Sequence, residues 1–173
     1  DGENENGEAA LAQASAQWEG AKNVLSQLLE KLAARQNHSI RNLLFIGDSC
    51  AELAQSDKAR DVYLRLLDNI EKDPEAQKTA AGAVTRVRSQ LIGLLRSQGQ
   101  FAEANKQVDA LLKTHPNALE PLMEKGRILQ SWAETDPKRY SECVAHWTRV
   151  RTLLGRVRNR PPEYYEALYN AAL

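Results

Sequence analysis

The sequence predicts an all-α protein made of consecutive antiparallel helix pairs, with about eight helices in 173 residues. Three observations predict this fold class. The strong helix formers alanine, leucine, glutamine, glutamate and arginine dominate the sequence. Apolar residues recur at every third or fourth position, and no stretch alternates as a strand would. The breaks between helical stretches are short, so consecutive helices are expected to run antiparallel.

The first seven residues, 1–7, are predicted to form a disordered acidic lead-in, because they hold three carboxylates, two glycines and no apolar side chain. The sequence has neither an initiating methionine nor a basic and then apolar leader, so we expect it to be a piece of a longer protein. No membrane span is expected. The longest run of large apolar residues, 43–46, is far shorter than the roughly 20 residues that cross a bilayer.

Proline and glycine mark the ends of the predicted helices. Asp73 and Asp136 each offer an N-cap carboxylate directly before a proline that suits the first helical turn. Gly99 suits a helix end that needs a positive φ. The helices are therefore expected to span residues 8–35, 39–54, 57–72, 75–98, 101–114, 118–134, 137–158 and 162–173.

The helix pairs repeat in the sequence. In each pair, apolar positions in the first helix are followed by a small residue in the second helix, and four positions later by a bulky one. The clearest unit runs from Leu91 to Pro116. The small positions are Ala59, Ala104 and Cys143, and the bulky positions are Tyr63, Val108 and Trp147.

This pattern resembles the tetratricopeptide repeat (TPR) family over residues 18–173. The resemblance implies a right-handed superhelical stack of antiparallel helix pairs, a TPR-like α-solenoid. It also implies that the small residues lie where two helices cross, and that the bulky residues, Trp18 included, fill the gap between neighbouring units. After the lead-in, the expected units are 8–37, 39–73, 75–116, 118–160 and a partial unit 161–173.

No motif in the sequence indicates catalysis, so we expect a protein that is not an enzyme and has no cofactor and no metal. A Gly-rich phosphate loop, a Gly-x-Ser-x-Gly elbow and a His-Glu-x-x-His pair are all missing from the sequence. Cys50 and Cys143 are interpreted as small buried hydrophobes, with a reactive thiol as the alternative. His146 follows Cys143 by three positions, but two ligands alone do not make a zinc site.

In the TPR family the first helix of each unit lines a concave groove that binds a peptide or a helix. The resemblance therefore implies a protein–protein interaction scaffold. Because arginines outnumber acids at the groove positions, the partner is expected to be a protein or peptide with some acidic character. The Lys/Asn/Arg clamp of chaperone-binding members is not matched here. The expected groove residues are Arg41, Leu44, Asp48, Arg86, Ser89, Arg96, Glu120, Met123 and Arg127.

Two other functions stay open. The apolar stripe of segment 162–173 would suit self-association in an oligomerisation or assembly segment. An arginine-edged helix near the end of the chain would suit a regulatory domain that binds nucleic acid, although a net charge of zero makes nucleic acid the less favoured partner. The compartment is open between the cytoplasm and a bacterial envelope space. The residues of this predicted basic surface are Arg149, Arg151, Arg156, Arg158 and Arg160.

Overall fold

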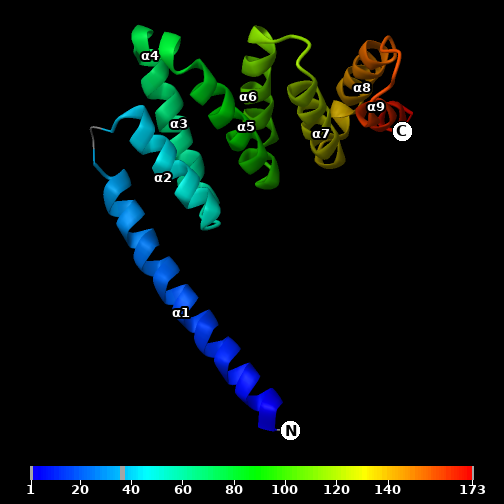
Figure 1. The fold of residues 1–173 in the computed structure, drawn as a ribbon. Helices are drawn as coiled ribbons and strands as arrows, with labels where there is room; N and C mark the ends of the chain where they lie inside the picture. Colours follow the sequence, from blue (N-terminus) through cyan, green and yellow to red (C-terminus); the bar gives the residue numbers. More distant parts are fainter. Residues whose placement is uncertain (1, 36–37, 173) are drawn as a thin grey trace. The chain divides into compact units, whose positions relative to one another are not determined.

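The computed structural model describes residues 2–35 and 38–172, and within those ranges it is all-α, with no strand (Figure 1). The chain divides into two compact units, Asp1–Thr79 (Unit 1) and Ala80–Leu173 (Unit 2), and each is described by itself. In the described part of the chain, no helix combines the length and the apolar character that crossing a membrane requires.

Unit 1 is built on a helical hairpin formed by α2 and α3. The second half of α1 packs on this hairpin and buries Leu29 there. The guanidinium group of Arg65 in α3 donates hydrogen bonds to the backbone carbonyls of Ala33 and Arg35, both at 2.7 Å. These bonds satisfy carbonyls that the end of α1 would otherwise leave unpaired. The helices of Unit 1 are α1 (Gly2–Ala33), α2 (Ile40–Glu52), α3 (Ser56–Lys72) and α4 (Pro74–Thr79).

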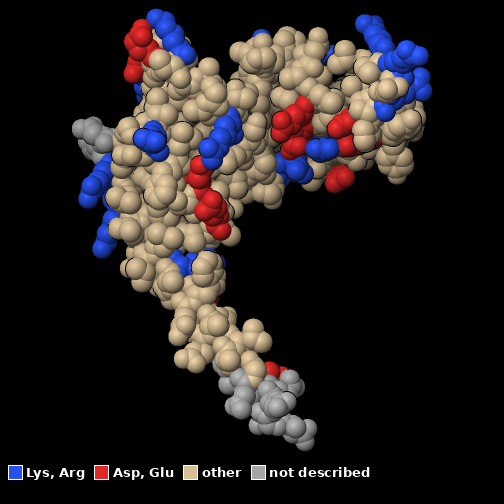
Figure 2. Space-filling model, in the orientation of Figure 1, with Lys and Arg blue, Asp and Glu red and all other residues tan. Residues whose placement is uncertain are grey.

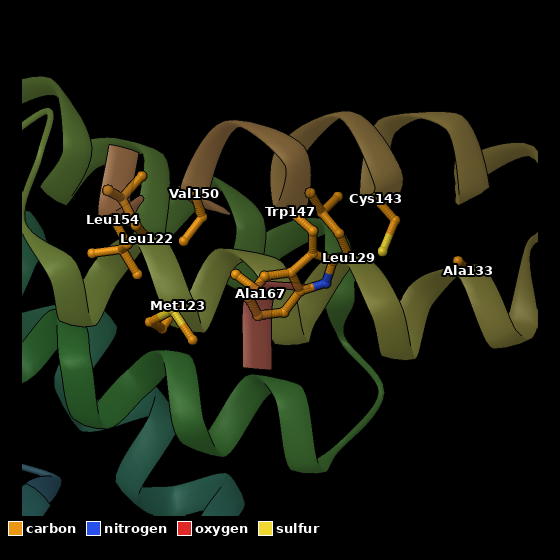
Figure 3. Close-up of a cluster of buried hydrophobic side chains, with 9 residues drawn as sticks. All are labelled: Leu122, Met123, Leu129, Ala133, Cys143, Trp147, Val150, Leu154 and Ala167. Carbon is orange, nitrogen blue, oxygen red and sulfur yellow. The ribbon is translucent and has the colours of Figure 1, made fainter. Parts of the chain in front are cut away.

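Unit 2 contains two hairpins, α5 with α6 and α7 with α8, and α6 also packs on α7. The last helix, α9, packs on α8. The core of the second hairpin gathers around Trp147, which points from α8 toward α7 (Figure 3). The elements of Unit 2 are α5 (Ala81–Ser97), α6 (Phe101–Thr114), α7 (Leu119–Thr135), the 3-10 helix η1 (Pro137–Arg139), α8 (Tyr140–Leu154) and α9 (Pro162–Asn170).

Three of the helix ends predicted from local sequence are confirmed, at Asp73, Asp136 and Gly99. The Asp73 carboxylate accepts a hydrogen bond from the backbone N–H of Glu75 at 2.9 Å, as an N-cap should. The Asp136 carboxylate accepts one from the backbone N–H of Lys138 at 3.2 Å. Gly99 has a φ of 70°, in the left-handed region that favours glycine.

Two predicted helices are wrong in their extent. The predicted helix 75–98 is interrupted at Ala80, so that α4 and α5 are separate. The predicted helix 137–158 opens with a 3-10 turn and ends at Leu154. Glycine follows at the next position, and beyond it Val157 offers the only large apolar side chain before the prolines, so packing gives little reason for the helix to continue.

The first half of α1 extends beyond the hairpin on which its second half packs (Figure 1). The helix passes through residues 2–7, where composition predicts disorder, and it is continuous at Gly20. Every described side chain between positions 7 and 20 is exposed. Trp18, expected to fill a gap between units, is 64% exposed, so this expectation is wrong for the described chain.

The bulky residue of a hairpin packs against a glycine in the first helix of the same hairpin. A Cβ atom added to Gly47 would lie 2.5 Å from the ring of Tyr63. A Cβ atom added to Gly126 would lie 2.4 Å from the ring of Trp147. Both rings are fully buried, so each glycine provides the space that an aromatic ring in the second helix occupies.

The hairpin of α5 and α6 uses the reverse combination of sizes. Its first helix has Ile92 at the glycine position and its second helix has the smaller Val108 at the aromatic position, and both are buried. The two positions lie 16 residues apart here, as Gly47 and Tyr63 do. Each hairpin therefore fills a similar volume at its crossing with a different pair of residues. The resemblance alone did not predict this pairing within a hairpin.

Ala54, in the turn between α2 and α3, has a φ of 57° and occupies the position that Gly99 occupies between α5 and α6. An L-residue with a Cβ atom is strained in this left-handed region. We expect Ala54→Gly to raise the free energy of unfolding by about 0.5–1 kcal/mol, measured by urea denaturation. Gly99→Ala should lower it by a similar amount. Equal stability of all three proteins would contradict the shared turn geometry.

Candidate partner-binding groove

A groove with a volume of about 210 Å³ opens on Unit 2 between α5 and α7. Ile92 of α5 and Leu111 of α6 give it an apolar part. Gly93 widens it, because a Cβ atom at that position would meet no other atom within 4 Å. The lining residues are Ser89, Ile92, Gly93, Arg96, Leu111, Glu120, Pro121, Glu124 and Arg127.

Three of the four charged side chains that line the groove belong to one connected ladder. Arg96 Nε lies 2.7 Å from Glu124 Oε1, and Glu124 Oε2 lies 3.6 Å from Arg127 Nη1. Arg127 in turn donates two hydrogen bonds, both 2.9 Å long, to the two carboxylate oxygens of Glu166 in α9. Figure 2 shows the interleaving of basic and acidic side chains on this unit.

The fork between Arg127 and Glu166 fixes the position of one wall of the groove. A bidentate arginine–carboxylate pair holds both groups in a defined geometry. Hydrogen bonding to Glu166, with the charges of Glu166 and Glu124, raises the pKa of Arg127 and keeps it charged. The pair is partly exposed, so its main effect is to position α9 and the groove wall rather than to add much stability.

The structure brings together four of the residues that the sequence predicted for a groove. Met123, also predicted there, is instead buried in the core at 3% exposure, because α7 turns that position toward α8 and α9. Arg86 is exposed on α5 but does not line this groove. The four predicted residues in the lining are Ser89, Arg96, Glu120 and Arg127.

The other three predicted groove residues belong to α2 in Unit 1. Arg41 is exposed and lines a separate cavity that also includes Leu32 of α1. Leu44 is half-buried. Asp48 accepts a hydrogen bond from the hydroxyl group of Tyr63 at 2.7 Å, which ties it to its own hairpin. These three residues therefore lie together on α2 and do not line the groove between α5 and α7.

Sequence reasoning missed the residues that complete the charge ladder. Glu124 is not among the groove residues that the sequence predicts. Glu166 lies 39 positions after its partner Arg127, and no local pattern links the two. Gly93 directly follows Ile92, the buried position that the repeat aligns. A residue one position later on a helix points about 100° away, so the sequence could have placed Gly93 on a more exposed face.

The predicted basic surface does not lie on one helix. Arg149 and Arg151 belong to α8, whereas the other three arginines lie in the segment that follows it, because α8 ends at Leu154. Arg160 stacks over the ring of Tyr164, with the guanidinium carbon 4.7 Å from the ring centroid. In the described part of the chain, none of the five arginines forms an ion pair. The three in the segment are Arg156, Arg158 and Arg160.

The cysteines and the neighbouring histidine have structural positions. Cys50 and Cys143 are both buried free thiols, as expected, and burial raises the pKa of each. His146 is buried, and its Nε2 donates a hydrogen bond to the backbone carbonyl of Leu122 at 2.8 Å. Within residues 2–35 and 38–172, no three or more His, Cys, Asp or Glu side chains gather as a metal site would require.

His146 predicts a pH dependence of stability. Burial lowers the pKa of His146, and the charges of Lys125 and Arg149 lower it further, although the bond to Leu122 and the charge of Asp109 oppose this. The unfolded chain regains a histidine pKa near 6.5, so it binds the proton more readily than the folded chain does. The stabilisation is therefore complete above about pH 6.5 and is lost as the pH falls from there toward the lowered value.

The test compares the wild type with His146→Gln, which keeps a donor for the carbonyl of Leu122 but cannot titrate. Urea denaturation at about pH 7.5 and about pH 5.5 should show a smaller loss of stability for the variant on acidification. The carboxylates titrate in both proteins, so the difference between them isolates the histidine. An equal loss in the two proteins would show that His146 is not buried in its neutral form.

Comparison with known proteins finds a similar fold. The chain is similar to a solved structure of TPR-like repeats assigned to a kinesin light chain of Podosopora anserina, with a TM-score of 0.59 and 16% sequence identity. The match covers 92% of this chain and 78% of that one. A scan against models of known families found no match, and neither did a search of curated proteins. This chain therefore has a TPR-like repeat fold.

Proposed function

We propose that this protein is a non-catalytic scaffold that binds a peptide or helix of another protein in the groove between α5 and α7. The observation that carries the proposal is the groove itself. It combines an open position at Gly93, above the buried Ile92, with three charged side chains that their partners already hold in place. Preorganised walls lower the entropic cost of binding a flexible segment.

The charges of the lining favour a ligand of mixed character. Arg96 and Arg127 line the groove together with Glu120 and Glu124, so the lining carries two positive and two negative side chains. An acidic ligand would have to compete with Glu124 for the same guanidinium groups. We therefore propose that an apolar side chain over Gly93 provides the affinity, and that polar groups on either side select the register. The acidic preference inferred from the sequence stays a prediction.

Filling the groove tests the proposal. The probe is a phage-displayed library of random peptides, selected on the wild-type chain. In Gly93→Leu the new side chain occupies the groove, and the selected peptides should bind at least about tenfold more weakly. The matched control is Gly82→Leu, at the start of the same helix, where a Cβ atom also meets nothing within 4 Å. Selected peptides that bind all three proteins equally would refute binding in this groove.

A second candidate function rests on the five arginines of the basic surface, which have no acidic partner within the described residues. Such a surface would bind the phosphates of nucleic acid. The test is a gel shift with single-stranded and double-stranded DNA at low salt, with the wild type and with the double variant Arg156→Glu, Arg158→Glu. A shift that the variant loses would support this function. If the wild type gives no shift at about 50 mM salt, that result would count against nucleic-acid binding.

Self-association through segment 162–173 is also still a prediction. Within α9, Ala167 is buried against the core that includes Trp147, so one side of the helix is already covered. The opposite side presents Tyr165, Leu168 and Tyr169, all of them exposed. These three residues lie at positions i, i+3 and i+4, which places them on one face.

A further inference from the structure

An apolar stripe follows the exposed part of α1. Leu11, Trp18 and Leu25 are spaced by seven residues, and their exposed fractions are 73%, 64% and 40%. A spacing of seven returns to nearly the same face of a helix, as in the seam of a coiled coil. Leu28, three positions after Leu25, widens the stripe and is also exposed. Trp and Leu side chains in such a row are characteristic of an interface rather than of a free surface.

The stripe leads into a positively charged cavity in Unit 1. This cavity, of about 470 Å³, lies between the end of α1 and the start of α2. Arg35 and Arg41 line it, and in the described part of the chain neither forms an ion pair. The lining contains no acidic residue, in contrast to the groove between α5 and α7. Its residues are Leu32, Arg35, His38, Arg41, Asn42, Phe45 and Ile46.

Charge is distributed unevenly along α1. The sequence before position 20 carries four glutamates, at positions 3, 5, 8 and 19, and no basic residue. From position 21 to 35 it carries Lys22, Lys31 and Arg35 against Glu30 alone, and Glu30 already pairs with Lys58 at 3.3 Å. Lys22 pairs with Glu19 of the same helix at 3.7 Å, so Lys31 and Arg35 carry the excess charge of this half. One half of the segment is thus acidic and the other half basic. Two such helices attract each other when they run antiparallel and gain nothing from charge when they run parallel.

We propose that the stripe is the interface of a homodimer in which α1 pairs antiparallel with α1 of a second copy. A two-fold axis near Trp18 places Leu11 opposite the partner's Leu25, and the acidic half of each helix alongside the basic half of the other. In this register Glu8 lies opposite the partner's Leu28, about two turns from the partner's cavity at Arg35 and Arg41.

The side chains on the stripe complement one another in size. Ala14 and Ala21 lie one turn on either side of Trp18 and are exposed with it. These small residues leave room for the partner's Trp18 where the two helices cross. Since the same patch faces itself across the axis, the interface closes on two copies and does not extend into a fibre.

The oligomeric state tests the proposal. Sedimentation equilibrium over a range of concentrations should show a dimer for the wild type. Trp18→Ala should raise the dissociation constant of the dimer at least about tenfold, because a central tryptophan carries much of the binding energy of an interface. The matched control is Asn23→Ala, since Asn23 is exposed on the same helix but on the face opposite the stripe. It should leave the dimer unchanged. A wild type that stays monomeric at every concentration would overturn the proposal.

Cysteine cross-linking tests the register. The two native cysteines are buried, so an introduced cysteine on α1 can be read separately. In an antiparallel pair, Leu11→Cys should cross-link with Leu25→Cys when the two variants are mixed, and neither should cross-link with itself. Self-linking of each variant alone would indicate a parallel pair and would overturn the register. Gly93→Leu should dimerise normally, so this test is independent of the groove in Unit 2.

The charged cavity gives a third readout. The double variant Arg35→Glu, Arg41→Glu should weaken the dimer, and added salt should weaken the wild-type dimer more than the variant dimer. Equal dissociation constants and equal salt dependence would show that the cavity takes no part in the dimer. Circular dichroism of each variant checks that the helical content is kept.

Discussion

Trp147→Ala is expected to lower the free energy of unfolding by about 3–5 kcal/mol, because it removes the largest side chain of a packed core. The indole is fully buried and contacts side chains from α7, α8 and α9, so its removal leaves a cavity that three helices surround (Figure 3). Urea denaturation followed by circular dichroism measures the loss without relying on tryptophan fluorescence.

Trp18→Ala is the matched control for this experiment. It removes the same side chain from a position that is 64% exposed, so it should change stability by less than about 0.5 kcal/mol when the protein is dilute enough to be monomeric. A loss below about 1 kcal/mol for Trp147→Ala would show that the indole is not the centre of a packed core.

Gly126→Ala is expected to lower the free energy of unfolding by about 1–3 kcal/mol, although alanine is the better helix former. The added methyl group would lie 2.4 Å from the ring of Trp147, so either the ring or α7 has to move. Gly93→Ala, in the neighbouring helix α5, should raise stability by about 0.5–1 kcal/mol, because its methyl group meets nothing and only the helix preference remains.

The opposite signs of the two glycine substitutions are the critical result. Both sites lie inside helices of Unit 2, so helix propensity acts equally on both. Thermal and urea unfolding should agree on the sign for each. Stabilisation by Gly126→Ala would mean that α7 and α8 do not approach as closely as the structure shows. A double variant that combines Gly126→Ala with Trp147→Leu should lose less stability than the two single changes together.

The helix pairs could be predicted from the sequence because the signals that set them are local. The caps at Asp73 and Asp136 need only the backbone N–H groups that follow them. The end of α8 could not be predicted in the same way. Apolar periodicity continues through Val157, but helices of this length depend on tertiary packing, and packing stops at Leu154.

Part of the groove could also be predicted, because the position of a residue on one helix face is a local property of the sequence. Ser89 and Arg96 share the exposed face of α5, so the repeat alignment was enough to place them. The bond between Arg127 and Glu166 depends on how α9 packs in Unit 2, and spacing along the chain does not report that. Met123 shows the limit of the alignment. A rotation of one position on α7 separates a groove residue from a core residue.

The resemblance to TPR proteins implied that Trp18 fills a gap between units, and its spacing to the following apolar residues fits a helix with one apolar face. The apolar spacing on α1 is as expected, but spacing alone does not identify the element that packs against the stripe. In the structure the stripe of α1 is covered near Leu29 and exposed at Trp18. The same pattern therefore serves packing within the chain at one end and is available for a second copy at the other.

The most direct test of the central claim is chemical-shift mapping by NMR, with a peptide selected from the random library added to the isotopically labelled protein. The account predicts that the amide shifts that change most belong to α5 and α7, around residues 89–96 and 120–127. Gly93→Leu should abolish those changes, and Gly82→Leu should keep them. Changes confined to α6 and α8, with α5 and α7 unaffected, would contradict the claim that the groove between α5 and α7 holds the partner.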